Sequence, residues 1–124
     1  MDYDTFTRAY LTCMLWAETD SSTPSGGEPL DSNYDLDDLA PIASATARRE
    51  CRDFQRGAEG LITGKEEQAG HDFWLTRNGH GAGFWDRPEV YGKTNAEILT
   101  RLAHACGEKD AVIGDDGLIY LEAA

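Results

Sequence analysis

The segment 71–87 is the feature that most constrains the fold, because it gathers aromatic residues around a centre rich in glycine and asparagine. Phe73 and Leu75 alternate with their neighbours, and a period of two is typical of a strand with one face on a core. Asn78-Gly79 favours a tight type I′ turn, because both residues tolerate positive φ. The segment therefore predicts an aromatic β-hairpin with its turn at these two residues.

This predicted hairpin presents both polar and aromatic side chains to a possible partner. The candidate contact residues are Trp74, Asn78, His80 and Trp85. An interface built on the aromatic residues requires at least one of the two tryptophans to be exposed. Such an interface is one function that the segment permits.

Helical spacing of apolar residues predicts three helices elsewhere in the chain. The first covers residues 4–18 and the second covers residues 35–63. The third begins at Thr94, where Thr94 and Glu97 have the form of a capping box. Gly107 then provides a C-terminal stop.

Turn-forming residues separate these elements. Residues 19–34 lack apolar periodicity and predict an exposed loop. Near the C-terminus, residues 111–113 and 118–121 flank an Asp-Gly turn and predict a second hairpin. The expected order is helix, helix, strand, strand, helix, strand, strand. We therefore expect one α+β domain over residues 1–124, with both hairpins in one antiparallel sheet and about three helices packed on it.

The net charge of −12 is the most informative bulk property of the chain. Residues 1–40 carry nine acidic residues and one arginine. A chain this acidic repels nucleic acid and anionic membranes and is attracted to basic surfaces. No apolar run approaches the roughly 20 residues that span a bilayer. The acidic N-terminus also lacks the basic start of a signal peptide, which predicts a cytoplasmic location.

The sequence carries no strong catalytic signature. The only cluster suited to metal binding or acid–base chemistry is His71, Asp72, His80 and Asp86. Adjacent residues of a strand point to opposite faces, so His71 and Asp72 would not share one ion. The cysteines Cys13, Cys51 and Cys106 are far apart and predict buried, reduced thiols. We therefore expect a protein that is not an enzyme and that uses no metal or cofactor.

The acidic surface is the stronger functional candidate. Carboxylates set at intervals comparable to phosphates can imitate a nucleic acid and occupy a channel lined by Lys and Arg. The candidate partner-binding residues are Asp35, Asp37, Asp38, Asp115 and Asp116. The same acids also fit a simpler interpretation, in which they cap helices, occupy turns and confer solubility or salt tolerance.

The segment Gly70–Arg87, which reads GHDFWLTRNGHGAGFWDR, resembles a segment that recurs in small proteins of bacteriophages and mobile elements. In those proteins, too, a helical region precedes it and an acidic Gly-Asp-Asp-Gly-like turn follows it. The resemblance covers the C-terminal half and the general layout, and it supplies no catalytic residues. It implies a phage or mobile-element setting, in which small acidic proteins often inhibit host defence as anti-CRISPR or anti-restriction proteins.

Together these observations predict a cytoplasmic α+β inhibitor that mimics nucleic acid. Its expected partner is a basic, nucleic-acid-handling host protein, such as a CRISPR effector complex or a restriction enzyme. Two alternatives stay open at this point. One is a phage accessory module that binds another protein through its aromatic hairpin, and the other is a small metal-dependent enzyme that uses His71, Asp72 or His80.

Overall fold

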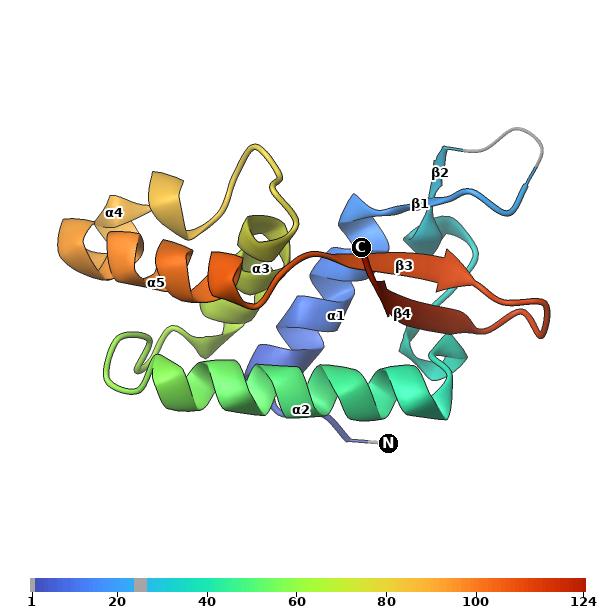
Figure 1. The fold of residues 1–124 in the computed structure, drawn as a ribbon, viewed down its shortest axis with the longest axis horizontal. Coiled ribbons are helices and arrows are strands. Elements are labelled where there is room, and N and C mark those ends of the chain that lie inside the picture. The colour runs from blue at the N-terminus through green and yellow to red at the C-terminus, as the bar shows by residue number, and fades with distance from the viewer. Residues whose placement is uncertain (1, 24–26) are drawn as a thin grey trace.

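The computed structural model describes residues 2–23 and 27–124 (Figure 1). Its helices are α1 Thr5–Ala17, α2 Pro41–Gly57, α3 Glu66–Arg77, α4 Pro88–Tyr91 and α5 Lys93–Ala105. Short 3-10 turns are η1 Leu30–Ser32, η2 Leu36–Asp38 and η3 Phe84–Asp86. The strands are β1 Thr19–Asp20, β2 Glu28–Pro29, β3 Lys109–Ile113 and β4 Ile119–Ala123. The fold is α+β as predicted, but the described part of the chain holds two separate two-stranded antiparallel sheets instead of one.

The core is centred where α1 crosses α3. The two backbones come so close that a Cβ atom on Gly70 would collide with the carbonyl oxygen of Phe6. Around this crossing the aromatic rings stack, with Phe54 and Phe73 at 4.1 Å and Tyr10 and Phe73 at 5.1 Å between ring centroids. Stacked and offset aromatic pairs of this kind stabilise a core beyond the area they bury. The contact fixes α3 as the central helix of the molecule.

The predicted hairpin over residues 71–87 is wrong, because most of its first half is the helix α3. All but one of the residues from Ala69 to Arg77 are buried, with His71 the exception. A helix that is buried on nearly every side shows no amphipathic stripe. Its apolar residues therefore have no helical period, and the short run in which Phe73 and Leu75 alternate with their neighbours resembles a strand.

Asn78-Gly79 ends this helix instead of turning a hairpin. Gly79 has φ 69°, its N–H donates to Thr76 O at 3.2 Å, and His80 N–H donates to Leu75 O at 3.0 Å. This pair of bonds is the Schellman motif, which needs a residue in the left-handed region. The Asn-Gly signal is thus shared by two structures, and here tertiary burial selects the helix.

Several other boundaries differ from the prediction. The second helix begins at Pro41 and ends at Gly57, because Asp35 caps the separate turn η2 before it. The third helix begins at Lys93, so Thr94 does not cap it and no capping box forms. The predicted loop 19–34 contains β1, β2 and η1, while its residues 24–26 lie outside the described residues.

Other predictions are confirmed. The first helix matches α1 to within one residue at each end, and the C-terminal hairpin is β3 and β4. Cys13 and Cys51 are buried free thiols, but Cys106 is exposed, which corrects the expectation that every cysteine is buried. The exposure follows from its position directly after the end of α5.

The C-terminal hairpin is attached to the segment that precedes α2. Leu39 forms a parallel bridge with Ile119, and Ala40 N–H donates to Ile119 O at 2.9 Å. This contact joins parts of the chain that are 80 residues apart in sequence. As Figure 1 shows, both small hairpins lie at one end of the molecule, whereas α4 and α5 lie at the other.

Candidate functional site

Seven exposed or partly exposed acidic residues belong to the segments that form the end of the molecule with the two hairpins, where Figure 1 shows β1, β2, β3 and β4. We call this surface the acidic end, and its members are Glu28, Asp31, Asp35, Asp37, Asp38, Asp115 and Asp116. No lysine or arginine occurs in residues 9–47 or 110–124, which supply this surface. The bridge between Leu39 and Ile119 brings the two acidic segments to the same end. The structure therefore unites the acidic residues that sequence analysis selected separately.

Two of the predicted carboxylates organise the turn η2. Asp35 Oδ1 accepts a hydrogen bond from Asp37 N–H at 2.9 Å, and Asp38 Oδ2 accepts one from Asp35 N–H at 2.8 Å. Asp35 and Asp37 are exposed, and Asp38 is partly exposed. Because one backbone donor occupies only part of a carboxylate, these side chains keep free acceptor sites toward solvent.

The turn between β3 and β4 carries the other predicted pair. Asp116 accepts hydrogen bonds from the Tyr120 hydroxyl at 2.6 Å and from Leu118 N–H at 3.0 Å. These bonds, that of Tyr120 first, lower the pKa of Asp116 below its usual value. Asp116 therefore adds negative charge to the acidic end at neutral pH, beside its exposed neighbour Asp115.

The ion pairs of the described residues involve other carboxylates. They are Arg52–Asp53, His71–Asp72, Arg77–Glu50, His80–Glu18, Arg87–Asp72 and Lys109–Glu50. None includes a member of the acidic end. Arg8 does line a hollow of about 240 Å³ together with Asp37, but its guanidinium lies over the Tyr3 ring, 6.0 Å from the centroid. Within the described residues, the protein's own cations do not pair with these carboxylates.

The predicted hairpin residues have mainly structural contacts. Trp74 is buried, and its Nε1–H donates to Glu18 Oε2 at 2.8 Å. His80 Nε2 lies 2.7 Å from the same oxygen, so both residues hold the end of α1. Asn78 Oδ1 accepts from Lys109 N–H at 2.8 Å and thereby positions the start of β3. Only Trp85, at 51% exposure, keeps a large free surface.

Asp72 lies at the centre of a buried polar network that the sequence did not reveal. Its carboxylate accepts hydrogen bonds from Arg87 Nε at 2.8 Å, from the Tyr91 hydroxyl at 2.7 Å and from Gln68 Nε2 at 3.1 Å. Burial raises the pKa of Asp72, but the neighbouring His71 ring and the hydrogen bonds from Tyr91, Arg87 and Gln68 outweigh it and lower this pKa below its usual value. The ionised carboxylate thus ties α3 to η3 and α4.

The candidate chemical residues do not form a metal centre within residues 2–23 and 27–124, where no group of three His, Cys, Asp or Glu side chains is arranged to hold an ion. His71 Nδ1 lies 3.8 Å from Asp72 Oδ1, which is beyond hydrogen-bonding distance. His80 is separated from this pair by its contact with Glu18. The structure therefore places His71 and Asp72 together but gives His80 a different partner.

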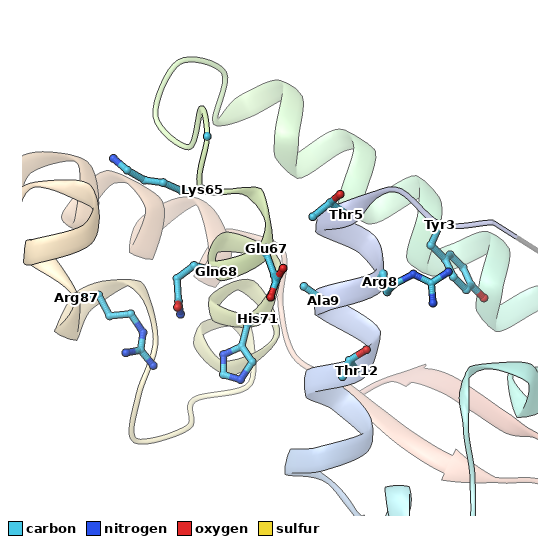
Figure 2. A pocket seen from close by; sticks show the side chains of 11 residues that line it. Tyr3, Thr5, Arg8, Ala9, Thr12, Lys65, Glu67, Gln68, His71 and Arg87 are labelled. Atoms are coloured by element: carbon cyan, nitrogen blue, oxygen red, sulfur yellow. The ribbon is translucent and has the colours of Figure 1, made fainter.

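A groove of about 880 Å³ lies between α1 and the start of α3 (Figure 2). It is lined by Tyr3, Thr5, Arg8, Ala9, Thr12, Gly64, Lys65, Glu67, Gln68, His71 and Arg87. We call it the α1–α3 groove. Its lining combines hydroxyl, amide and cationic groups, and sequence analysis selected only His71 among them. The other residues were missed because they come from three separate segments of the chain.

No protein-family model, curated protein or solved structure matches this chain. Separately, none of the helices in the described ranges is both long enough and apolar enough to cross a bilayer. The acidic end and the α1–α3 groove are the two surfaces of the molecule that suggest a function.

Proposed function

We propose that this protein inhibits a nucleic-acid-targeting defence complex of a host bacterium, as an anti-CRISPR or anti-restriction protein. It acts in the cytoplasm by binding, without catalysis. The acidic end imitates nucleic acid and occupies a basic groove of the defence complex. The observation that supports this proposal is the acidic end itself, whose seven carboxylates come from segments without lysine or arginine and form no ion pairs in the described structure.

The carboxylates of the acidic end form no ion pairs in the described structure, and this decides how much charge a partner meets. A carboxylate already paired with a nearby cation presents little net field, whereas unpaired carboxylates attract Lys and Arg over about one Debye length, roughly 8 Å at physiological salt. The same clustering of one charge sign accelerates encounter with an oppositely charged surface. The protein therefore offers a basic groove the attraction that a phosphate backbone offers.

The resemblance of residues 70–87 to phage and mobile-element proteins supports the setting of this proposal and leaves the contact surface open. In the structure most of that segment is committed to the fold, through α3, Asp72 and Trp74. The acidic end lies outside the segment. Binding is thus assigned to the acidic end, and the phage-like segment is assigned to the scaffold that presents it.

The proposal is tested by removing charge while keeping the turn η2 intact. In the triple variant Asp35→Asn, Asp37→Asn and Asp38→Asn, the amide oxygens that replace the Asp35 and Asp38 carboxylates can still accept the hydrogen bonds of the turn. A matched control removes three exposed charges at distant positions, Glu89→Gln, Glu97→Gln and Glu108→Gln. Both variants have the same net charge, so a difference between them reports the location of the charge.

The measurement begins with a pull-down from host lysate, with identification of the partner by mass, and continues with Kd values at several salt concentrations. If each lost charge contact is worth about 0.5 kcal/mol, the triple variant should bind about tenfold more weakly. The control should bind within about twofold of the wild type, and wild-type affinity should fall as salt rises. Equal loss in both variants, or affinity that does not change with salt, would contradict charge mimicry.

A second candidate function is supported by Trp85, which is half-exposed on η3. Aromatic residues with a free surface are common anchors of protein–protein contacts. In this alternative the protein is an accessory interaction module and its charge is incidental. Trp85→Ala would then abolish capture of the partner, whereas the triple aspartate variant would retain it.

A further inference from the structure

The geometry points to a second binding site, in which the α1–α3 groove holds a small phosphorylated molecule with a planar ring, the chemical class of nucleotides. This inference does not depend on the proposed function, because it uses different residues on a different surface. The volume of about 880 Å³ lies within the range of roughly 300–1,000 Å³ that is usual for small-molecule sites.

The lining of the groove is richer in cations than the chain as a whole. This lining contains three Lys or Arg residues and one acid, whereas the chain as a whole has 11 basic and 23 acidic residues. Arg87 is paired with the buried Asp72, so Arg8 and Lys65 against Glu67 leave an excess of one positive charge in the groove. Because salt screens charges beyond roughly 8 Å, the lining dominates the field that a small ligand meets inside the groove. An anion is favoured there despite the net charge of −12.

The cationic side chains of the groove are also free to bind an anionic ligand. Lys65 and Arg8 form no ion pair within the described residues. Arg87 is anchored by its Nε atom, which donates to Asp72 at 2.8 Å, and its terminal nitrogens have no hydrogen bond in the described structure. A guanidinium fixed in this way is oriented before the ligand arrives, and its planar fork suits phosphate oxygens.

The shape of the groove follows from residue sizes at the helix crossing. Ala9 and Gly70 lie where α1 and α3 are closest. Because neither residue has a large side chain, the groove is deep at this point. Figure 2 shows His71 and Glu67 of α3 facing Ala9 and Thr12 of α1, with Gln68 and Arg87 to one side and Arg8 with Tyr3 to the other. His71 adds a ring atom, Nδ1, that is buried and has no hydrogen-bond partner in the described part of the chain.

A place for the ring lies at one end of the groove. Thr5, Ala9, Thr12 and Trp16 are spaced by four, three and four residues, which puts them on one face of α1. Trp16 is 61% exposed, and its ring centroid lies 5.9 Å from that of His71. Trp16 lies outside the lining of the groove, but its exposed indole is next to His71, which lines it, so a nucleobase can stack there. In this arrangement Arg87 binds the phosphates and Trp16 stacks on the ring, and the Lys65 side chain, which Figure 2 shows directed outward, turns toward the phosphates when the ligand binds.

The experiment measures binding of ADP, GDP, UDP and inorganic pyrophosphate to the full chain by calorimetry. Lys65→Gln removes an unpaired charge, and Trp16→Ala removes the stacking surface. The matched controls are Arg101→Gln and Trp85→Ala, which remove an exposed cation and an exposed indole outside the groove. Circular dichroism verifies that each variant is folded.

We expect at least one nucleotide to bind with a Kd below 1 mM and more tightly than pyrophosphate. Lys65→Gln should weaken nucleotide and pyrophosphate binding by severalfold, whereas Trp16→Ala should weaken only the nucleotide, by about tenfold. Both control variants should bind as the wild type does. The inference is overturned if none of the three nucleotides binds at 1 mM, if Lys65→Gln and Trp16→Ala leave their affinity unchanged, or if the controls weaken it equally.

Discussion

Replacing Arg77 with methionine should destabilise the protein more than replacing any exposed arginine. The Arg77 side chain is fully buried and donates to four groups: Tyr10 Oη at 3.1 Å, Glu50 Oε1 at 2.8 Å, Cys106 O at 2.9 Å and Gly107 O at 2.8 Å. These groups lie on α1, on α2 and at the end of α5. A single guanidinium thus links α3 to three other parts of the fold.

The expected loss of unfolding free energy follows from the hydrogen-bond acceptors that Arg77→Met leaves without their donor. Hydrogen bonds to a charged group are worth about 1.5–3 kcal/mol each, so four of them set a high upper bound. The loss is reduced because Glu50 is partly exposed and retains Lys109 Nζ at 3.5 Å. Breaking a buried ion pair typically costs about 3–5 kcal/mol, and we expect Arg77→Met to fall in this range. For a domain of this size that lowers the Tm by about 10–20 °C.

The assay is urea unfolding followed by circular dichroism and tryptophan fluorescence. The control is Arg52→Met, because Arg52 is more than half exposed and lies 3.9 Å from Asp53. A surface pair of this kind contributes about 0–1 kcal/mol. Combining Arg77→Met with Glu50→Gln should cost less than the sum of the single losses, since the two residues form one network. A loss below about 1 kcal/mol for Arg77→Met would refute the assigned role.

Two further predictions concern the contacts of α3. Because the pKa of Asp72 is lowered in the folded protein, its charge contributes stability above the unfolded pKa of about 3.9, and this contribution is lost as pH falls through the folded value. The free energy of unfolding of Asp72→Asn should therefore be about 2–4 kcal/mol lower than that of the wild type at pH 7, and this difference should shrink below pH 4. A difference that stays constant with pH would contradict this. Gly70→Ala should lower the free energy of unfolding by at least about 2 kcal/mol, because the new Cβ meets the α1 backbone, whereas Gly57→Ala, with open space around it, should be neutral or stabilising in the same urea titration.

The elements that sequence patterns predicted correctly are those with a local cause. The helix α1 has an apolar stripe and an N-cap, Asp4, whose side chain accepts from Thr7 N–H. The β3–β4 hairpin has its turn residues directly between two apolar runs. In both cases neighbouring residues carry the information, so a pattern of ten or twenty residues is sufficient.

The elements that sequence patterns predicted wrongly depend on contacts with the rest of the molecule. Burial on nearly all sides removed the helical period of α3, and the Asn-Gly pair that ends it is equally suited to a hairpin. The candidate site likewise depends on contacts between distant segments, which local sequence patterns do not reveal. Composition revealed the acidic residues, but their meeting at one end depends on the contact of Leu39 with Ile119. The structural role of Arg77 also has no local signal, since all four of its acceptors are at least 27 residues away.

The lack of lysine and arginine around the acidic end has a practical chemical consequence. Trypsin cleaves after Arg8 and next after Arg48, so most of this surface is released in one 40-residue peptide. Amine-reactive cross-linkers find no lysine side chain there, since the chain has only Lys65, Lys93 and Lys109. Carbodiimide activation, in contrast, joins its carboxylates directly to the lysines of a bound protein. A zero-length cross-link traced to that peptide would identify both the partner and the contact in one mass spectrum.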